Sequence, residues 1–452
     1  MRSYAPLLSL AFLCAACDPP TPAATSSSGG PPMPPASAGS TVAVDSATPP
    51  APTTAPAPVA PVAPPAAGEL GALAKSNNAL AFDLYGKARA AAGNLALSPI
   101  SISTALTMTW AGAKGETAAQ MKKVLHAEGE ANKAMDLSGK LVASFGNADS
   151  KVTLRVANRL FGEKTYTFDQ GYLDRTRAAF GAPLEALDFQ HAADPARVHI
   201  NQWVAAQTQD RIKDLIPAKA LDAETRLVLT NAIYFLGDWT SPFEKERTKP
   251  TPFHATAADT KDVPTMSQTA HFRFVAADGV KILEMPYQGG EVAMTLVLPD
   301  APAGLDAVEK QLTSDLWTKW VGALQFEQVN VALPKFEINP AASLSLGDTL
   351  QALGMPLAFD RARADFTGIA NPPNPADRLF ISKVFHKAFV KVDEKGTEAA
   401  AATAVVMARA GAAFNPKPPA ELKADHPFLF VLRQVKSGAI LFIGRVSDPA
   451  AK

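Results

Sequence analysis

The chain has 452 residues, of which 43 are basic and 43 acidic, so its formal net charge at neutral pH is zero. It contains no run of basic residues, which argues against nucleic acid as a partner. The two cysteines, Cys14 and Cys17, both lie close to the N-terminus. We therefore expect no disulfide, no thiolate metal site and no cofactor in the rest of the chain.

Residues 1–17 have the pattern of a secretory signal, with a charge at Arg2 followed by a short apolar stretch from Leu7 to Leu13. The segment ends Leu13-Cys-Ala-Ala-Cys17, which resembles a bacterial lipoprotein signal with Cys17 as the lipidated residue, although Cys14 stands where leucine is usual. These features predict an exported bacterial protein, held by lipid at the cell envelope or outside the cell.

Residues 18–68 are rich in proline and alanine and contain only two charged residues, Asp18 and Asp45. A segment of this composition cannot bury a hydrophobic core, so it is expected to be a disordered linker. We expect the folded domain to extend from residue 69 to residue 449.

Helices are predicted mainly in the first part of this domain. Residues 69–87 carry apolar side chains at helical spacing. Ser98-Pro99 is typical of a helix start, with a capping side chain before a first-turn proline. Asp194-Pro195 has the same pattern before His199–Thr208.

Strands are predicted mainly in the later part, from short apolar or alternating runs that are bounded by turn residues. The expected strands are Leu154–Phe161, Leu227–Phe235, Ile282–Pro286, Met294–Pro299, Asn330–Lys335, Val384–Val392, Pro427–Leu432 and Ala439–Val446. This order favours an α+β fold with large sheets over a doubly wound α/β fold.

Two polar residues interrupt predicted apolar strands: Asn231 lies in Leu227–Phe235 and His386 lies in Val384–Val392. Burying an amide or an imidazole is costly unless it is hydrogen-bonded. We expect these two side chains to bond each other, with Ser98 or Ser101 nearby. For a lone histidine in such a position, a structural role is the expectation.

The stretch from Asp393 to Met407 reads Asp-Glu-Lys-Gly-Thr-Glu-Ala-Ala-Ala-Ala-Thr-Ala-Val-Val-Met. Gly396 opens it, and small or β-branched residues follow with no charge after Glu398. Taken alone, the four alanines also suit a helix or a surface loop. The run also suits a segment that is an exposed loop in one state and a buried strand in another, and the rest of the chain favours this second interpretation.

Motifs of common enzymes are absent: the chain has no Gly-x-Ser-x-Gly, no His-Glu-x-x-His and no glycine-rich phosphate loop. Its seven histidines are scattered along the sequence. A protein without enzymatic activity is therefore expected.

Several blocks, in order, resemble the serpin family from about residue 69 to residue 449. They are the segment 94–109, Gly112–Thr117, Asn231–Trp239, Leu333–Phe336, His386–Glu394, Asp425–Phe430 and Phe442–Val446. The resemblance implies the serpin fold, with three β-sheets, eight or nine helices and an exposed reactive-centre loop at about residues 394–424.

The resemblance also implies a mechanism. A serine or cysteine endopeptidase attacks the loop and becomes acylated, and the loop inserts as a strand before the ester can be hydrolysed. The protease stays covalently trapped by what is expected to be a monomeric inhibitor. The alternative is a non-inhibitory protein that uses the same fold for binding or as a surface protein.

Residue roles carried over by position concern the loop and the sheet that would receive it. The hinge would be Glu394, Gly396, Thr397, Glu398, Ala399, Ala400 and Ala401. Lys335 would pair with Glu394 and Trp239 would pack beneath, while Ser98, Ser101, Asn231 and His386 would form a polar cluster under the sheet. The family's loop spacing puts the scissile bond between Ala410 and Gly411, with Arg409 as the alternative specificity residue.

Overall fold

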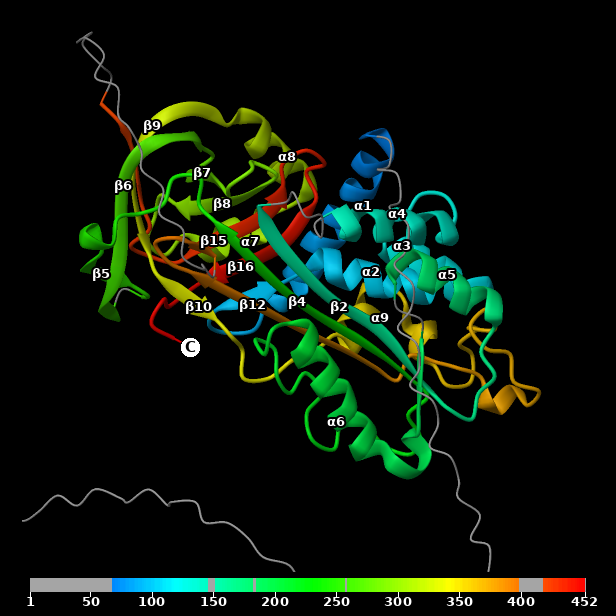
Figure 1. Ribbon diagram of the computed structural model, residues 1–452. Helices are drawn as coiled ribbons and strands as arrows, with labels where there is room; N and C mark the ends of the chain where they lie inside the picture. The colour runs from blue at the N-terminus through cyan, green and yellow to red at the C-terminus, as the bar shows by residue number, and fades with distance from the viewer. Residues whose placement is uncertain (1–66, 145–150, 182–183, 257, 398–417, 452) are drawn as a thin grey trace, which may run out of the picture. The chain divides into compact units, whose positions relative to one another are not determined.

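The computed structural model describes residues 67–144, 151–181, 184–256, 258–397 and 418–451 (Figure 1). The expected signal at residues 1–17 and all but the last two residues of the expected linker lie outside this part of the chain. Within it there are nine α-helices: α1 (Ala67–Ala88), α2 (Pro99–Trp110), α3 (Gly115–Val124), α4 (Ala131–Ser144), α5 (Gln170–Phe180), α6 (Phe189–Gln207), α7 (Leu305–Gln311), α8 (Ser314–Ala323) and α9 (Gly347–Leu353). Three short 3-10 helices accompany them: η1 (Lys245–Arg247), η2 (Pro356–Phe359) and η3 (Pro375–Asp377).

A seven-stranded sheet crosses the middle of the domain. Its order is β10-β12-β13-β4-β2-β3, with β11 paired to β12. The strands are β2 (Val152–Glu163), β3 (Glu185–Leu187), β4 (Leu227–Asp238), β10 (Phe336–Ile338), β11 (Leu344–Ser345), β12 (Lys383–Val392) and β13 (Gly396–Thr397). Figure 1 shows this sheet between α6 on one side and α2 on the other.

A nine-stranded sheet contains the remaining strands, in the order β1-β16-β15-β8-β7-β6-β9-β14, with β5 paired to β6. They are β1 (Leu95–Leu97), β5 (Lys249–His254), β6 (Thr260–Ala277), β7 (Val280–Pro286), β8 (Val292–Pro299), β9 (Gln325–Pro334), β14 (Ala420–Lys423), β15 (Phe428–Gln434) and β16 (Ile440–Val446). The three expected sheets thus form two hydrogen-bonded sheets, because β6 is long enough to pair with β5 at its start and with β7 at its end. The expected α+β fold is confirmed.

Strand β4 is buried on both faces, which explains its nearly continuous apolar sequence. On one face, Val228 and Ala232 pack in a cluster with Ile200 and Val204 of α6. Residues that alternate with these belong to the cores on the opposite face. Any strand entering beside β4 must therefore suit an apolar environment on both faces.

Two predicted helix starts differ in detail from the structure. Ser98 precedes α2, but its hydroxyl donates to the carbonyl oxygen of Leu441 (2.7 Å) and does not cap the helix. Helix α6 begins at Phe189, capped by Asp188, well before the predicted start at Asp194-Pro195. Its backbone is non-helical at Ala192, so Pro195 lies in the first turn after a kink, where a proline is tolerated.

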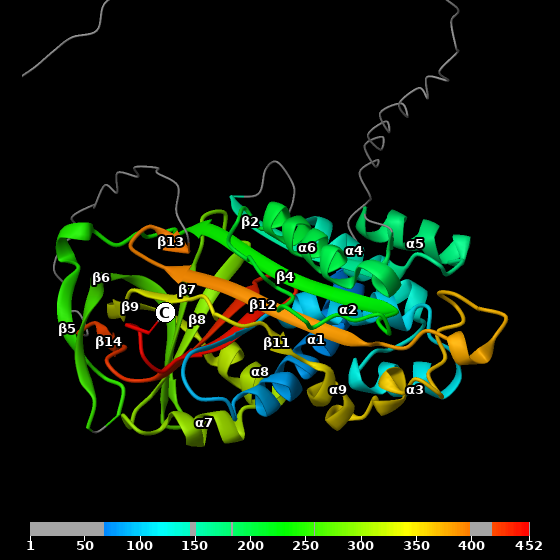
Figure 2. The same ribbon diagram turned by 90° about the horizontal axis from the view of Figure 1, so that it is seen from below.

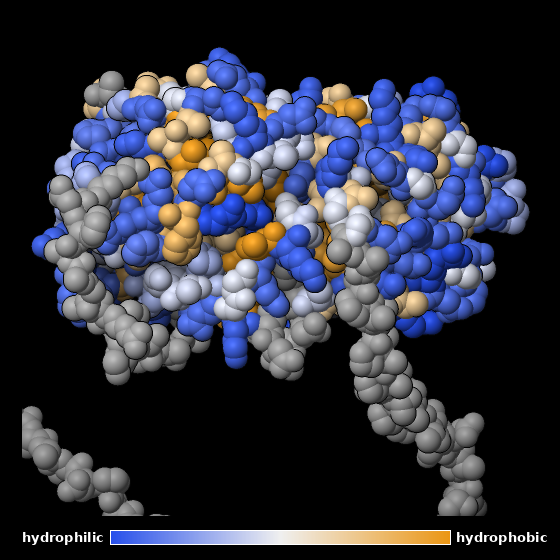
Figure 3. Space-filling view, turned by 90° about the horizontal axis from the view of Figure 1, so that it is seen from above, coloured by the Kyte–Doolittle hydropathy of each residue, from blue (hydrophilic) through white to orange (hydrophobic). Residues whose placement is uncertain are grey.

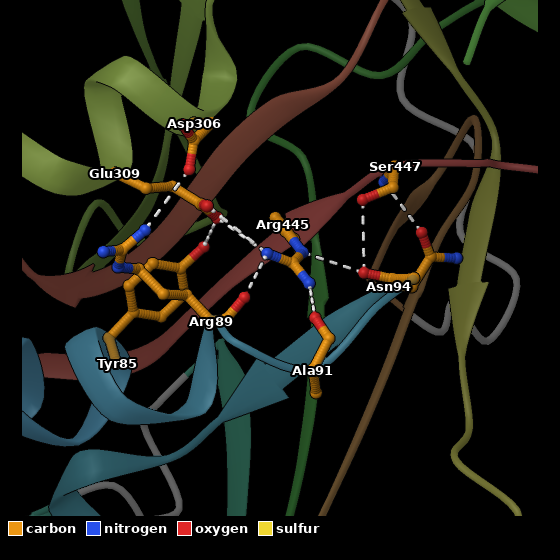
Figure 4. Close-up of polar contacts among 9 residues, drawn as sticks. Tyr85, Arg89, Ala91, Asn94, Asp306, Glu309, Arg445 and Ser447 are labelled. Atoms are coloured by element: carbon orange, nitrogen blue, oxygen red, sulfur yellow. Dashed lines mark hydrogen bonds and ion pairs between the residues drawn. The ribbon is translucent and has the colours of Figure 1, made fainter. Parts of the chain in front are cut away.

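Arg445 of β16 ties α1 and α7 to the nine-stranded sheet (Figure 4). Its guanidinium donates to the carbonyl oxygens of Arg89 (3.0 Å) and Ala91, which satisfies carbonyl groups at and beyond the end of α1. It also pairs with the buried carboxylate of Glu309 (3.2 Å), which accepts a hydrogen bond from the Tyr85 hydroxyl (2.5 Å). The buried charge is thus paired as well as hydrogen-bonded.

The surface seen from above is largely hydrophilic, with small separate hydrophobic areas (Figure 3). Among the described residues, no helix combines the length and apolar character needed to cross a bilayer. Figure 2 shows that β13 and β14, which flank residues 398–417, lie at the same end of the domain as β5, β6 and β9. Helices α3 and α5 lie at the opposite end.

Candidate functional site: the opening between β4 and β12

Strands β4 and β12 separate at one end of the seven-stranded sheet. Over seven residue pairs, from Lys383 opposite Val228 to Phe389 opposite Tyr234, they run parallel and bond each other directly. Beyond that point β13 lies between them, antiparallel to both. Gly396 and Thr397 of the predicted hinge are therefore already part of the sheet.

Gly396 is required by the close approach of β13 to β4. A Cβ atom at this position would lie 2.0 Å from the carbonyl oxygen of Gly237, a contact that no side chain can make. The next residue, Thr397, is fully buried, and its hydroxyl is 2.6 Å from that of Tyr287. Gly396 and Thr397 of the predicted hinge thus occupy tightly fitted positions.

Trp239 lies beneath the opening, as expected, and is buried. Its indole N–H donates to the carbonyl oxygen of Asp393 (3.1 Å), and its backbone N–H donates to that of Lys395 (2.7 Å). The indole stacks on Tyr287, with ring centroids 4.4 Å apart. Burial raises the pKa of the Tyr287 hydroxyl, which therefore stays protonated.

Glu394 and Lys335 form the predicted ion pair, with Nζ 2.9 Å from one carboxylate oxygen and 3.1 Å from the other. The hydroxyl of Thr248 donates to the same carboxylate (2.9 Å). Burial acts to raise the pKa of Glu394, but the hydrogen bonds from Lys335 and Thr248 outweigh it and hold the pKa below its ordinary value. Glu394 is thus held by Lys335, which directly follows β9, and by Thr248, which directly precedes β5.

His386 and Asn231 contact each other at the centre of the sheet, as predicted from their burial. The His386 Nδ1 atom bonds the Asn231 side-chain oxygen, and Nε2 accepts from the backbone N–H of Ser98 (3.1 Å). Complete burial lowers the pKa of His386 to about 3, so the imidazole is neutral at physiological pH. The Asn231 amide nitrogen has no hydrogen-bond partner in the described part of the chain.

Ser101 does not join this group. Its hydroxyl donates to the side-chain oxygen of Asn158 (2.8 Å), whose amide donates back to the Ser101 carbonyl (2.9 Å). Asn158 lies on β2 opposite Asn231 of β4, so the sheet carries two neighbouring polar pairs. The single predicted cluster is therefore corrected to two pairs, anchored at opposite ends of the first turn of α2.

Sequence reasoning missed Tyr287, Thr248 and Asn158. Asn158 carried a usable signal, because it interrupts an apolar strand as Asn231 does. Tyr287 follows the buried strand β7 and Thr248 precedes the mostly exposed strand β5. Only the fold brings these two residues to the hinge. The remaining predicted residues lie outside the described residues: Glu398, Ala399, Ala400, Ala401, Arg409, Ala410, Gly411 and Cys17.

Chemically, the opening provides backbone pairing partners. Within the described ranges no group of three or more histidine, cysteine or acidic side chains could hold a metal ion. The opening instead offers two strands that already accommodate the start of a third. Such an arrangement can take up an extended segment by β-strand addition.

Comparisons with known proteins agree with this geometry. Residues 75–449 match the family model described as Serpin (serine protease inhibitor). The human leukocyte elastase inhibitor is 41% identical over 388 residues, covering 83% of this chain and 99% of the relative. Serpin48 of the insect Tenebrio molitor, described as a highly specific serpin, superposes with a TM-score of 0.73 at 31% identity, covering 83% of this chain and 98% of that one.

A binding protein has a similar fold. Human thyroxine-binding globulin, solved in complex with its hormone, superposes with a TM-score of 0.75 at 27% identity. The alignment covers 84% of this chain and 100% of that protein. Similarity of fold therefore does not distinguish a protein that traps a protease from one that binds a ligand. The hinge and the loop have to distinguish them.

Proposed function

This chain belongs to the serpin family of serine protease inhibitors, and from that membership we propose that it is an inhibitory serpin that traps its protease by inserting the cleaved loop between β4 and β12. Family membership confirms the expectation of a protease inhibitor. The trapping mechanism, the target and the cellular location are the proposal made here.

The observation that carries the proposal is the position of β13. Thr397 is paired with Val392 of β12 on one side and with Gly237 of β4 on the other. A strand that continued from Thr397 along the same line would reach the place where β4 and β12 now bond each other. Insertion would replace those seven direct pairs by two new strand interfaces, which is a net gain of backbone hydrogen bonds.

The sequence after Thr397 suits that path. Residues 399–404 are alanines and one threonine, small enough for a site buried on both faces. Because Glu398 would alternate with Thr397, its side chain would point to the opposite face of the new strand. There the facing positions of β4 and β12, Leu236 and Lys391, are only partly buried. Nothing bulky in this run opposes insertion.

The target is proposed to be a serine endopeptidase that accepts a small residue before the cut. Counting along the loop with the family's spacing gives Ala410 before the scissile bond and Gly411 after it. The relative named for leukocyte elastase is consistent with a narrow specificity pocket. If the loop register is shorter by one, Arg409 becomes the determinant and a trypsin-like protease the target.

The protein is further proposed to act outside the cytoplasm of a bacterium, anchored through lipid on Cys17. The support is the N-terminal sequence alone: a charged start, a short apolar stretch and a cysteine in a small-residue context. The linker to residue 68 would let the domain reach away from the membrane surface.

Incubation with a panel of elastase-, subtilisin- and trypsin-like proteases tests the proposal, with SDS-stable complexes as the readout. We expect a covalent complex with at least one small-residue protease. Mass spectrometry of the released C-terminal fragment then locates the cut, since a fragment starting at Gly411 supports Ala410 and one starting at Ala410 supports Arg409. Cleavage of the loop by every protease without any complex would favour a binding protein.

A further inference from the structure

The face of the nine-stranded sheet beside the loop's return carries an exposed aromatic pair and a pocket. Residues 398–417 connect β13 to β14, and β14 pairs in parallel with β9, Ala420 lying opposite Val329. Because the pairing is parallel, the chain arriving at Ala420 comes from the direction of Gln328 and Phe326. The outer face of β6, β9 and β14, which we call the return face, therefore adjoins the loop.

Alternation along the strands separates this face from the core. On β9, Val329 and Val331 are buried, whereas Phe326, Gln328 and Asn330 are exposed. The outer positions of the neighbouring strands also carry mostly polar side chains. They include Thr269 and His271 on β6 and Glu421 and Lys423 on β14.

Phe326 is unusual within the described chain. Its side chain is 72% exposed, whereas the other large hydrophobic residues that are exposed, Val198 and Val435, reach only 38% and 37%. Its ring stacks against that of His271 on β6, with centroids 6.0 Å apart and planes 14° from parallel. The stack holds a broad apolar surface in place, so a partner could bind it at little cost in side-chain entropy.

A pocket of about 460 Å³ adjoins β9 and β14 on the same sheet. Its lining combines the cations Arg247 and Lys423 with Glu421 and with the polar residues Thr269 and Asn330. The Thr269 hydroxyl donates to the Asn330 side-chain oxygen (2.7 Å), which braces the floor between the two strands. An aromatic anchor next to a polar hollow is the composition of a protein-binding surface.

Chain length puts this face within reach of a protease that is captured on the loop. Pro418 is eight residue steps after Ala410, and an extended chain spans at most about 3.5 Å per residue, so the scissile bond lies within about 28 Å of Pro418. A protease domain of about 230 residues has a radius of gyration of about 17 Å and is roughly 40 Å across. Phe326 is only three residues, or about 10 Å, before the start of the β9–β14 pairing.

We propose that the return face is a second contact surface for the protease captured on the loop, with the Phe326–His271 stack as its anchor. The inference rests on the proposed function and adds a site outside the loop. An apolar side chain of the protease would cover the stack. Polar groups of the protease around this contact would bind in the pocket lined by Arg247, Glu421 and Lys423. This contact would accelerate capture without taking part in insertion.

The test uses full-length protein and pancreatic elastase as the probe, with Val435→Ser as the matched control for removal of an exposed apolar side chain. For Phe326→Ser combined with His271→Ser, we expect the second-order rate constant of complex formation to fall about tenfold. The number of inhibitor molecules consumed per trapped protease and the melting temperature should stay as in wild type. Affinity for an active-site Ser→Ala elastase should weaken by the same factor, whereas Val435→Ser should change neither value.

The outcomes separate the two proposals. If wild type forms no covalent complex with elastase or any other protease of the panel, both proposals fall. If wild type traps elastase and the double variant does so within twofold of its rate, only the second contact surface is overturned. A change of oligomeric state on size-exclusion chromatography, with an unchanged trapping rate, would also overturn it and assign the face to contacts between copies of the chain.

Discussion

His386 illustrates how a buried side chain fixes its own protonation state. Because Nε2 accepts the N–H of Ser98, the single imidazole proton must be on Nδ1, where it donates to Asn231. A second proton would place an N–H group against the N–H of Ser98 in a site without water contact. Protonation of His386 is therefore coupled to unfolding of the protein.

This coupling predicts a pH dependence with a definite sign. The pKa of His386 is about 3 in the folded protein and near 6.5 when unfolded, so below pH 6.5 the unfolded state binds the extra proton. The stabilising contribution is complete above pH 6.5 and is lost as the pH falls towards 3. Between pH 7 and pH 5 it amounts to about 2 kcal/mol of unfolding free energy.

Urea unfolding at these two pH values checks the prediction. His386→Gln should reduce the drop in unfolding free energy between pH 7 and pH 5 by about 2 kcal/mol relative to wild type. The exposed His254→Gln serves as a control and should leave the drop as it is in wild type. Equal drops in all three proteins would contradict the assigned state of His386.

Thr397 is the residue at which insertion can be blocked with one substitution. Thr397→Arg would bring a charge into a fully buried position beside Tyr287, so we expect the hinge to leave the sheet while the rest of the domain stays folded. The loop should then be cut as an ordinary substrate, with covalent complex reduced at least tenfold on a gel. Thr397→Ser keeps the hydroxyl and should trap normally; efficient trapping by the arginine variant would count against insertion from this hinge.

At the scale of elements, cleavage of the loop should change the sheet itself. A cut between residues 405 and 413 frees the segment after β13 to pair with β4 and β12. Because a full strand is added, the melting temperature should rise by roughly 20 °C, measured by circular dichroism before and after verified cleavage. The Thr397→Arg protein, cut in the same way, should show little of this rise, and an unchanged value for wild type would refute insertion.

Sequence patterns predicted the elements whose burial is simple. Strand β4 is almost continuously apolar, β12 has apolar residues at alternating positions, and β15 and β16 form a buried hairpin, so their residue patterns mark them as strands. Strand β6 was missed, since its 18 residues mix polar side chains with Pro264 and are held by pairing to β5, β7 and β9. The start of α6 was misplaced because Asp188 caps the helix ahead of a kink that no local signal announces.

The candidate site likewise contains some contacts that the sequence predicted and others that it did not. Asn231 and His386 could be matched to each other because a buried amide and a buried imidazole need partners. The pairing of Glu394 with Lys335 came only from the resemblance to the serpin family. Tyr287 could not be matched in this way, since it reaches the hinge only through the meeting of the two sheets at Trp239. Contacts between sheets depend on register and crossing, which a single sequence does not encode locally.

For the whole molecule, the proposed lipid on Cys17 would decide where the inhibitor works. If Cys17 carries lipid, Cys17→Ser should move the protein from the membrane fraction to the soluble fraction, because acyl chains would be the strong anchor. Protease trapping by the released protein should match that of wild type. Identical fractionation of both proteins would reject lipid anchoring while leaving the inhibitor proposal intact.

One consequence of the parallel contact between β4 and β12 concerns β4 alone. Successive amides along a strand point to opposite edges, so one set faces β2 across eleven residue pairs and the alternate set faces β12 across seven. Only the second interface has to part when a strand enters. In native-state hydrogen–deuterium exchange, neighbouring amides of this single strand should therefore exchange at alternating rates, faster toward β12 and slower toward β2, although every one of them is buried. The edge of β4 that faces β2 would thus report on the stability of the fold, and the edge that faces β12 would report on how readily the sheet opens.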